Sequence, residues 1–150
     1  SELPYTVEID LSFVEETRNV NQIRNCIAGA AARYREGKRD QSRVLTGTKI
    51  ESGYDHWQLI TDNSSKLKNT EGQSKLGSKC KVYTLVSPVM KGMDGLREIN
   101  GVMSALMKMN KVILHNTAGY RVQVDVSALP IEEQKTVCSN YIHREATLKA

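Results

Sequence analysis

The chain of 150 residues is poor in aromatic side chains, which make up 5% of it and include one Phe and one Trp. RNA-binding modules such as the RRM stack bases on aromatic side chains, so this scarcity argues against them. The chain also lacks the ~18 consecutive apolar residues of a membrane-spanning helix, and its start lacks the basic-then-apolar order of a signal peptide. We expect a soluble, non-membrane protein. Since Ser1 is not a methionine, secretion after removal of a leader stays an alternative to an intracellular location.

Cysteine is scarce as well. The three cysteines, Cys26, Cys80 and Cys138, are far apart, with no C-x-x-C pair and no histidine at a metal-ligand spacing. This pattern argues against a structural zinc site, and the odd number favours a reducing compartment. Ser87 lacks the G-x-S-x-G context of a nucleophile elbow, which argues against a serine hydrolase of that kind.

Basic residues are in modest excess: 21 Lys and Arg against 17 Asp and Glu give a net charge of +4. This balance permits binding to phosphates without requiring it. Residues 62–80 are polar, without apolar periodicity, and we expect them to form a mobile loop within a single domain of residues 1–150. Four lysines fall in this loop: Lys66, Lys68, Lys75 and Lys79. They make nucleic-acid binding one alternative function.

Two segments alternate apolar and polar residues, which predicts two half-buried strands: residues 5–13 and residues 120–126. Further strands are expected over residues 43–50, 57–61, 81–86 and 111–115. Helical spacing predicts helices over residues 19–36 and 94–110 and after Ser127. The order is β-α-β-β-β-α-β-β-α. It predicts an α+β fold with a largely antiparallel sheet and helices packed on one face.

The polar residues of the two alternating strands are candidates for a site. If the strands share a sheet, Glu8 and Asp10 lie on the wetter face together with Arg121, Gln123 and Asp125. A sheet face that gathers three carboxylates and an arginine is a candidate ligand platform.

Several strings resemble the amidoligase family of carboxylate–amine ligases, whose catalytic fold is glutamine-synthetase-like. These strings are Leu85-Val86-Ser87-Pro88-Val89-Met90, Gly92, Asp94-Gly95-Leu96, and residues 116–125. The resemblance extends to residues 7–10, similar to the family's Gly-x-Glu-x-Glu strand, and to Glu145. Trp57, Asp62 and Ser64 are similar to its Trp-x-x-x-x-Asp-x-Ser segment. Nearly the whole chain is covered.

The resemblance implies an ATP-dependent reaction in which an acyl phosphate is attacked by an amine and clustered acids hold magnesium. It implies Glu8 and Asp10 as metal ligands, and it places Arg121 and Gln123 at catalytic positions. The residues implied to contact the nucleotide are Asp62, Ser64, Arg121 and Asp125.

This chain departs from the family pattern at the residues that matter for catalysis. Arg121 and Gln123 stand in place of the histidines of Gly-x-His-Val-His, and neither transfers protons near neutral pH. Thr84 replaces a glutamate, and relatives continue beyond the last helix, which ends here at Leu148. We therefore expect a shortened, degenerate member of the family.

We expect this member to be a pseudoenzyme that binds an unknown protein or small molecule and needs no cofactor. The first alternative is a working carboxylate–amine ligase that uses Mg and ATP with altered active-site residues. The second alternative is a basic nucleic-acid-binding or secreted effector protein.

Overall fold

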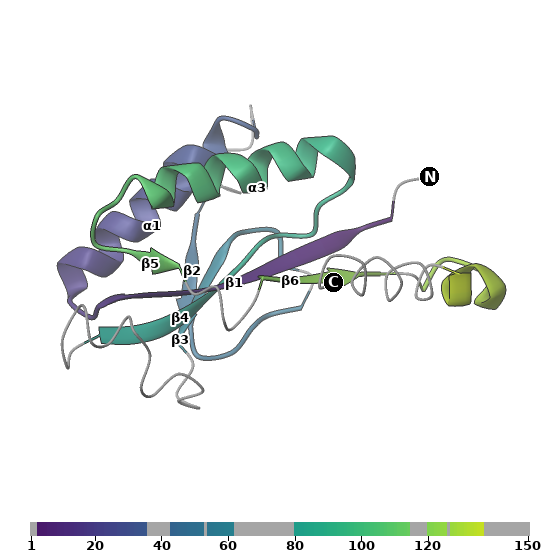
Figure 1. Ribbon diagram of the computed structural model, residues 1–150, viewed down its shortest axis with the longest axis horizontal. Helices are drawn as coiled ribbons and strands as arrows, with labels where there is room; N and C mark the ends of the chain where they lie inside the picture. The colour runs from purple at the N-terminus through teal and green to yellow at the C-terminus, as the bar shows by residue number, and fades with distance from the viewer. Residues whose placement is uncertain are drawn as a thin grey trace, which may run out of the picture.

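A computed structural model describes residues 3–35, 43–52, 54–61, 80–114, 120–125 and 127–136 (Figure 1). The elements are β1 (Tyr5–Val14), α1 (Thr17–Ala32), β2 (Leu45–Gly47), β3 (Gln58–Thr61), β4 (Cys80–Val86), α3 (Gly92–Met107), β5 (Ile113–Leu114) and β6 (Tyr120–Val124). Residues 131–136 are also helical. The predicted order of strands and helices is confirmed. Most of the loop expected over residues 62–80 lies outside the described residues, and Cys80 begins β4 instead of ending a loop.

The sheet has six strands, and β1 is at its centre. Its order is β2-β3-β4-β1-β5, and β6 also pairs with β1. Since β4 occupies one edge of β1, β5 and β6 share the other edge, at Leu11–Ser12 and at Tyr5–Ile9 respectively. All pairs are antiparallel except β2 with β3. The largely antiparallel α+β fold is therefore confirmed, and residues 120–125 lie directly beside the first strand of the chain.

Helices α1 and α3 cover one face of this sheet (Figure 1). From Val7 to Phe13 the odd-numbered residues of β1 point toward the helices and are buried, and Leu11 and Phe13 have no exposed surface. The helices bury residues at helical spacing: Ile23, Ile27 and Ala31 of α1, and Ile99, Val102 and Leu106 of α3. In the part of the chain that the structure describes, no helix is long and apolar enough to span a membrane.

The start of α1 differs from the sequence prediction. The helix begins at Thr17, with Glu16 as its N-cap residue, so Asn19, where the predicted helix starts, lies inside the helix and not at its cap. The Asn19 side chain instead donates a 3.0 Å hydrogen bond to the carbonyl of Val14, at the end of β1. Its amide therefore fastens the first turn of the helix to the strand before it.

The polar face of β1 corrects a second expectation. We predicted a wetter face, yet Glu8, Asp10 and Ser12 are 9%, 7% and 0% exposed, so this stretch of β1 is buried on both faces. Alternation predicts a wet face because unpaired polar groups are costly to bury. Here the two carboxylates are buried with partners on the neighbouring strands, which only the tertiary structure supplies.

Candidate functional site

The candidate site is an ion-pair cluster in which Arg121 of β6 binds two carboxylates of β1. The strand register places Arg121 opposite Glu8. The guanidinium Nη1 and Nη2 donate to the two oxygens of Asp10 at 3.1 and 3.0 Å, and Nε donates to Oε2 of Glu8 at 3.3 Å. The pair with Asp10 is bidentate, the geometry that guanidinium and carboxylate groups form best. Two segments more than a hundred residues apart in sequence thus meet on one face, as the alternation predicts.

Thr84 of β4 holds Asp10 from the other side. It lies opposite Asp10 in the β1–β4 register, and its hydroxyl donates a 2.9 Å hydrogen bond to Oδ1. The resemblance places a glutamate at this position, which would add a negative charge, whereas the threonine adds a donor. Hydrogen bonding to Asp10 is the largest cause that raises the pKa of Arg121. The arginine therefore stays a cation, and the three charges of the cluster sum to −1.

A hollow of about 220 Å³ opens on this same face of the sheet. Among its lining residues are two carboxylates, Glu8 and Glu51, and two amides, Gln58 and Gln123. Its described lining includes no Lys or Arg. The hollow therefore combines carboxylate, amide and hydroxyl groups with the apolar side chains of Ile50, Val86 and Val89, and it lies beside the Arg121 cluster.

Gln58 fixes one wall of this hollow. The side chain is 1% exposed, and its amide makes two hydrogen bonds with the backbone of Glu51: Oε1 accepts from N–H at 2.8 Å, and Nε2 donates to the carbonyl at 3.1 Å. Gln58 was not among the site residues predicted from the sequence. An isolated glutamine in a short strand carries no pattern, and its role comes from a segment that the fold brings over the strand.

Ser87 explains part of the Ser-Pro motif that carries the family resemblance. Its hydroxyl accepts a 2.8 Å hydrogen bond from the backbone N–H of Val7 and donates one of 2.9 Å to the carbonyl of Pro88. The backbone N–H of Ser87 also bonds the Val7 carbonyl at 2.9 Å. Ser87 thus fastens the end of β4 to β1 beside the hollow, which is a positioning role for a residue buried to 2% exposure.

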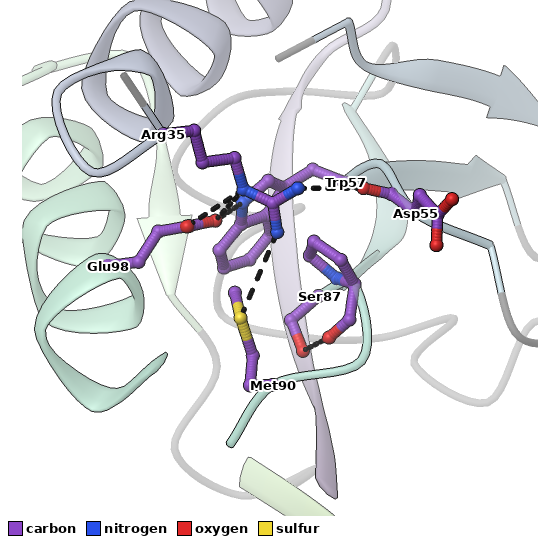
Figure 2. A network of polar contacts seen from close by, with 7 residues as sticks. Arg35, Asp55, Trp57, Ser87, Met90 and Glu98 are labelled. Atoms are coloured by element: carbon purple, nitrogen blue, oxygen red, sulfur yellow. Dashed lines mark hydrogen bonds and ion pairs between the residues drawn. The ribbon is translucent and has the colours of Figure 1, made fainter. Parts of the chain in front are cut away.

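A second polar network lies on the helix side of the sheet (Figure 2). Glu98 of α3 is 4% exposed; it accepts from the indole of Trp57 at 2.8 Å and from Nε of Arg35 at 2.9 and 3.1 Å. Arg35 also donates to the carbonyl of Asp55 at 2.9 Å. Because each charged group here has a partner, the network ties α3 to the segments after α1 and before β3. Its role is to hold the elements in place.

The structure does not bring every predicted site residue to the cluster. Asp125 is exposed beyond the end of β6, where it accepts from the backbone N–H and hydroxyl of Ser127 at 2.9 and 2.6 Å. These hydrogen bonds lower the pKa of Asp125. Asp62 and Ser64, the proposed nucleotide contacts, lie outside the described residues, as do the four lysines of residues 62–79 and Glu145. Their roles stay predictions.

The magnesium ion that the family resemblance implies can be tested against these side chains. Magnesium takes oxygen ligands in near-octahedral geometry. Among the described residues, no group of three or more His, Cys, Asp or Glu side chains is placed to hold a metal ion. Both oxygens of Asp10 and one of Glu8 accept from Arg121, so a divalent ion between these carboxylates would meet the guanidinium cation. The described residues, as they are arranged, do not fit a magnesium site.

Comparison with known proteins agrees with the resemblance found in the sequence. Comparison with curated proteins and with solved structures gives no match. A family model described as "Putative amidoligase enzyme" matches residues 3–150, a range that includes both strands of the Arg121 cluster, the Ser87-Pro88 motif and Trp57. Because this match spans far more than half of the chain, the chain belongs to the amidoligase family.

Proposed function

We propose that this chain is a non-catalytic binding protein of the amidoligase family, and that the hollow beside Glu8 and Gln123 takes a small ligand rich in N–H donors. The observation that carries the proposal is the position of Arg121, whose guanidinium binds the carboxylates of both Glu8 and Asp10. An internal cation occupies the place where a ligase of this family is expected to need a metal.

The chemistry of the cluster supports a binding role over catalysis. Phosphoryl transfer from ATP depends on a metal that bridges the phosphates and on groups that neutralise the charge developing on them. Arg121 has its charge matched by two carboxylates, and an arginine does not exchange protons near neutral pH. Gln123 has no titratable proton. Neither group is suited to general acid–base work.

The lining of the hollow supports a ligand other than a nucleotide. A triphosphate placed there would meet the carboxylates of Glu8 and Glu51, so repulsion opposes its binding. A volume of about 220 Å³ is also below the roughly 300–1,000 Å³ of sites for drug-sized ligands. A primary amine, an ammonium group or an amide matches both the size and the acceptors of this hollow.

The first experiment separates the binding role from the ligase alternative, which the retention of Glu8 and Asp10 favours. Full-length protein is titrated with Mg-ATP by calorimetry, and phosphate release is measured with amines and carboxylates present. We expect no saturable heat and no release. Magnesium-dependent ATP binding that disappears in Glu8→Gln would overturn the proposal in favour of the ligase.

The second experiment tests the ligand class. Small amines and amides are titrated into labelled protein while amide chemical shifts are followed by NMR. We expect saturable shifts at residues around the hollow, and loss of them in Gln123→Leu. Asn25→Leu, another amide-to-leucine change at an exposed position of α1, is the control and is expected to leave them unaltered. No saturable shift with any amine or amide would contradict the assigned ligand class.

A further inference from the structure

Strand β6 forms an edge of the sheet. Among the described residues it pairs with β1 and with no other strand. The backbone N–H of Asp125 donates to the carbonyl of Pro4 at 2.8 Å, and in an antiparallel ladder the groups that face the partner alternate along the strand. The N–H and C=O groups of Arg121 and Gln123 therefore face β1, and those of Val122 and Val124 face away from it.

The same strand leaves apolar surface exposed on the face that the helices cover elsewhere. Val122 lies opposite Val7 in the register, so the two side chains point to the same face. Val7 is 1% exposed, whereas Val122 is 39% and Val124 is 43% exposed. The helices thus cover Val7 of β1 and leave the two valines of β6 partly exposed. An edge with outward N–H groups and two exposed valines is one that proteins ordinarily cover or pair.

We propose that a second copy of this chain pairs with β6 in antiparallel fashion about a two-fold axis at Val122. The strand is self-complementary in that register. Val122 faces itself, Val124 faces residue 120, and Arg121 faces Gln123, so no two like charges lie directly opposite each other. The outward backbone groups of Val122 and Val124 gain partners, and the valines of both copies bury one another.

This pairing joins the polar faces of the two sheets as well as the sheets themselves. Arg121 and Gln123 share a face with Glu8 and Asp10, and the two-fold places Gln123 of the second copy beside Arg121 of the first. The two clusters then lie on one continuous face of a shared sheet. The inference concerns assembly and does not depend on what the hollow binds, so the two proposals succeed or fail separately.

The association state of the full chain tests the inference. Sedimentation equilibrium up to millimolar protein is expected to show a monomer–dimer equilibrium. Val122→Lys, which places two cations opposite each other at the axis, is expected to abolish the dimer. Met107→Lys adds the same charge at an exposed residue of α3, 70% exposed, and is expected to retain it. Circular dichroism verifies that each variant is folded.

A wild-type chain that stays monomeric at the highest concentration overturns the inference. A dimer that survives Val122→Lys, or one that Met107→Lys dissolves, overturns it too, because the interface then lies elsewhere.

Cysteine cross-linking tests the register independently. Directly opposed residues in a hydrogen-bonded antiparallel pair have Cα atoms about 5.5 Å apart, within disulfide reach. Under mild oxidation Val122→Cys is expected to give a covalent dimer. Val124→Cys is expected to give no covalent dimer beyond the wild-type level. In the proposed register residue 124 lies opposite residue 120 of the second copy, so the two introduced cysteines are at opposite ends of the paired strands. Equal cross-linking of the two variants would contradict the proposed axis.

Discussion

The indole N–H of Trp57 donates a 2.8 Å hydrogen bond to the carboxylate of Glu98, which also binds Arg35 (Figure 2). Trp57 is one of the residues that carry the family resemblance, and it is fully buried. Its contact with Glu98 shows that this motif residue has a structural role, because the indole N–H supplies one of the hydrogen bonds that the buried Glu98 carboxylate needs.

Removal of either donor should therefore cost stability. Arg35→Gln leaves the Glu98 charge buried without its cation, and we expect it to lower the free energy of unfolding by about 3–5 kcal/mol. Trp57→Phe removes one hydrogen bond and some apolar volume, and we expect a loss of about 2–4 kcal/mol. Urea denaturation measures both, and a double-mutant cycle gives their coupling. A loss below about 1 kcal/mol for Arg35→Gln would contradict a buried, stabilising pair.

Replacement of Arg121 should expose the repulsion between Glu8 and Asp10. The arginine side chain is 43% exposed, so solvent screens part of the effect, and we expect Arg121→Gln to cost about 1–3 kcal/mol. Arg97→Gln breaks an exposed pair with Asp94 and should cost less than about 0.5 kcal/mol.

Arg121→Gln should also create a weak divalent-cation site, since the two carboxylates lose their internal cation. Magnesium is expected to raise the melting temperature of this variant and to leave that of the wild type unchanged. Equal responses of the two proteins would show that Arg121 does not exclude the ion. Calcium provides a second oxygen-seeking probe in the same measurement.

Two glycines in helices should respond to alanine with opposite signs. At Gly29 of α1 an added Cβ meets nothing within 4 Å, so Gly29→Ala should stabilise the protein by about 0.5–1 kcal/mol through helix propensity. At Gly95 of α3 the same atom lies 2.6 Å from the Tyr5 hydroxyl and 2.7 Å from Cβ of Met90. Gly95→Ala should therefore destabilise it by about 1–3 kcal/mol. Thermal denaturation compares the pair, and equal shifts would contradict the packing of Tyr5 against α3.

Alkaline pH should destabilise the protein through Tyr83, which stacks on Phe13 at 4.3 Å. Burial, with a smaller contribution from Glu15, raises the pKa of Tyr83 to about 12. The unfolded phenol ionises near its ordinary pKa of about 10, so the unfolded state loses its proton first. The stabilising effect is complete below about pH 10 and is lost as the pH rises toward 12, an effect of roughly 2–3 kcal/mol.

Tyr83→Phe should remove this part of the pH dependence while leaving the stacked ring in place. Urea denaturation at a series of alkaline pH values measures the effect, and the near-ultraviolet absorbance of tyrosinate identifies the ionising group. Identical slopes for the wild type and Tyr83→Phe would assign the alkaline loss of stability to other residues.

The sequence predicted the positions of the strands and helices more accurately than the contacts between them. Strict alternation over residues 5–13 and 120–126 located β1 and β6, and helical spacing located α1 and α3, because each pattern is a local consequence of one buried face. The cap of α1 and the parallel pairing of β2 with β3 were not predicted. The Asn19 side chain bonds the carbonyl of Val14, five residues earlier, instead of capping the helix, and the β2–β3 pairing joins two separate strands. Neither contact leaves a periodic pattern in the sequence.

The sequence by itself determined which residues of each strand face the helices and which face the opposite side, because side chains alternate along any extended chain. The sequence therefore also determined that Glu8, Asp10 and Arg121 lie on one polar face once their two strands share a sheet. Only the tertiary structure decided that Arg121 binds both carboxylates, that Thr84 donates to Asp10, and that this face is buried. Those outcomes depend on strand order and register, since the partners come from strands that are far apart in the sequence.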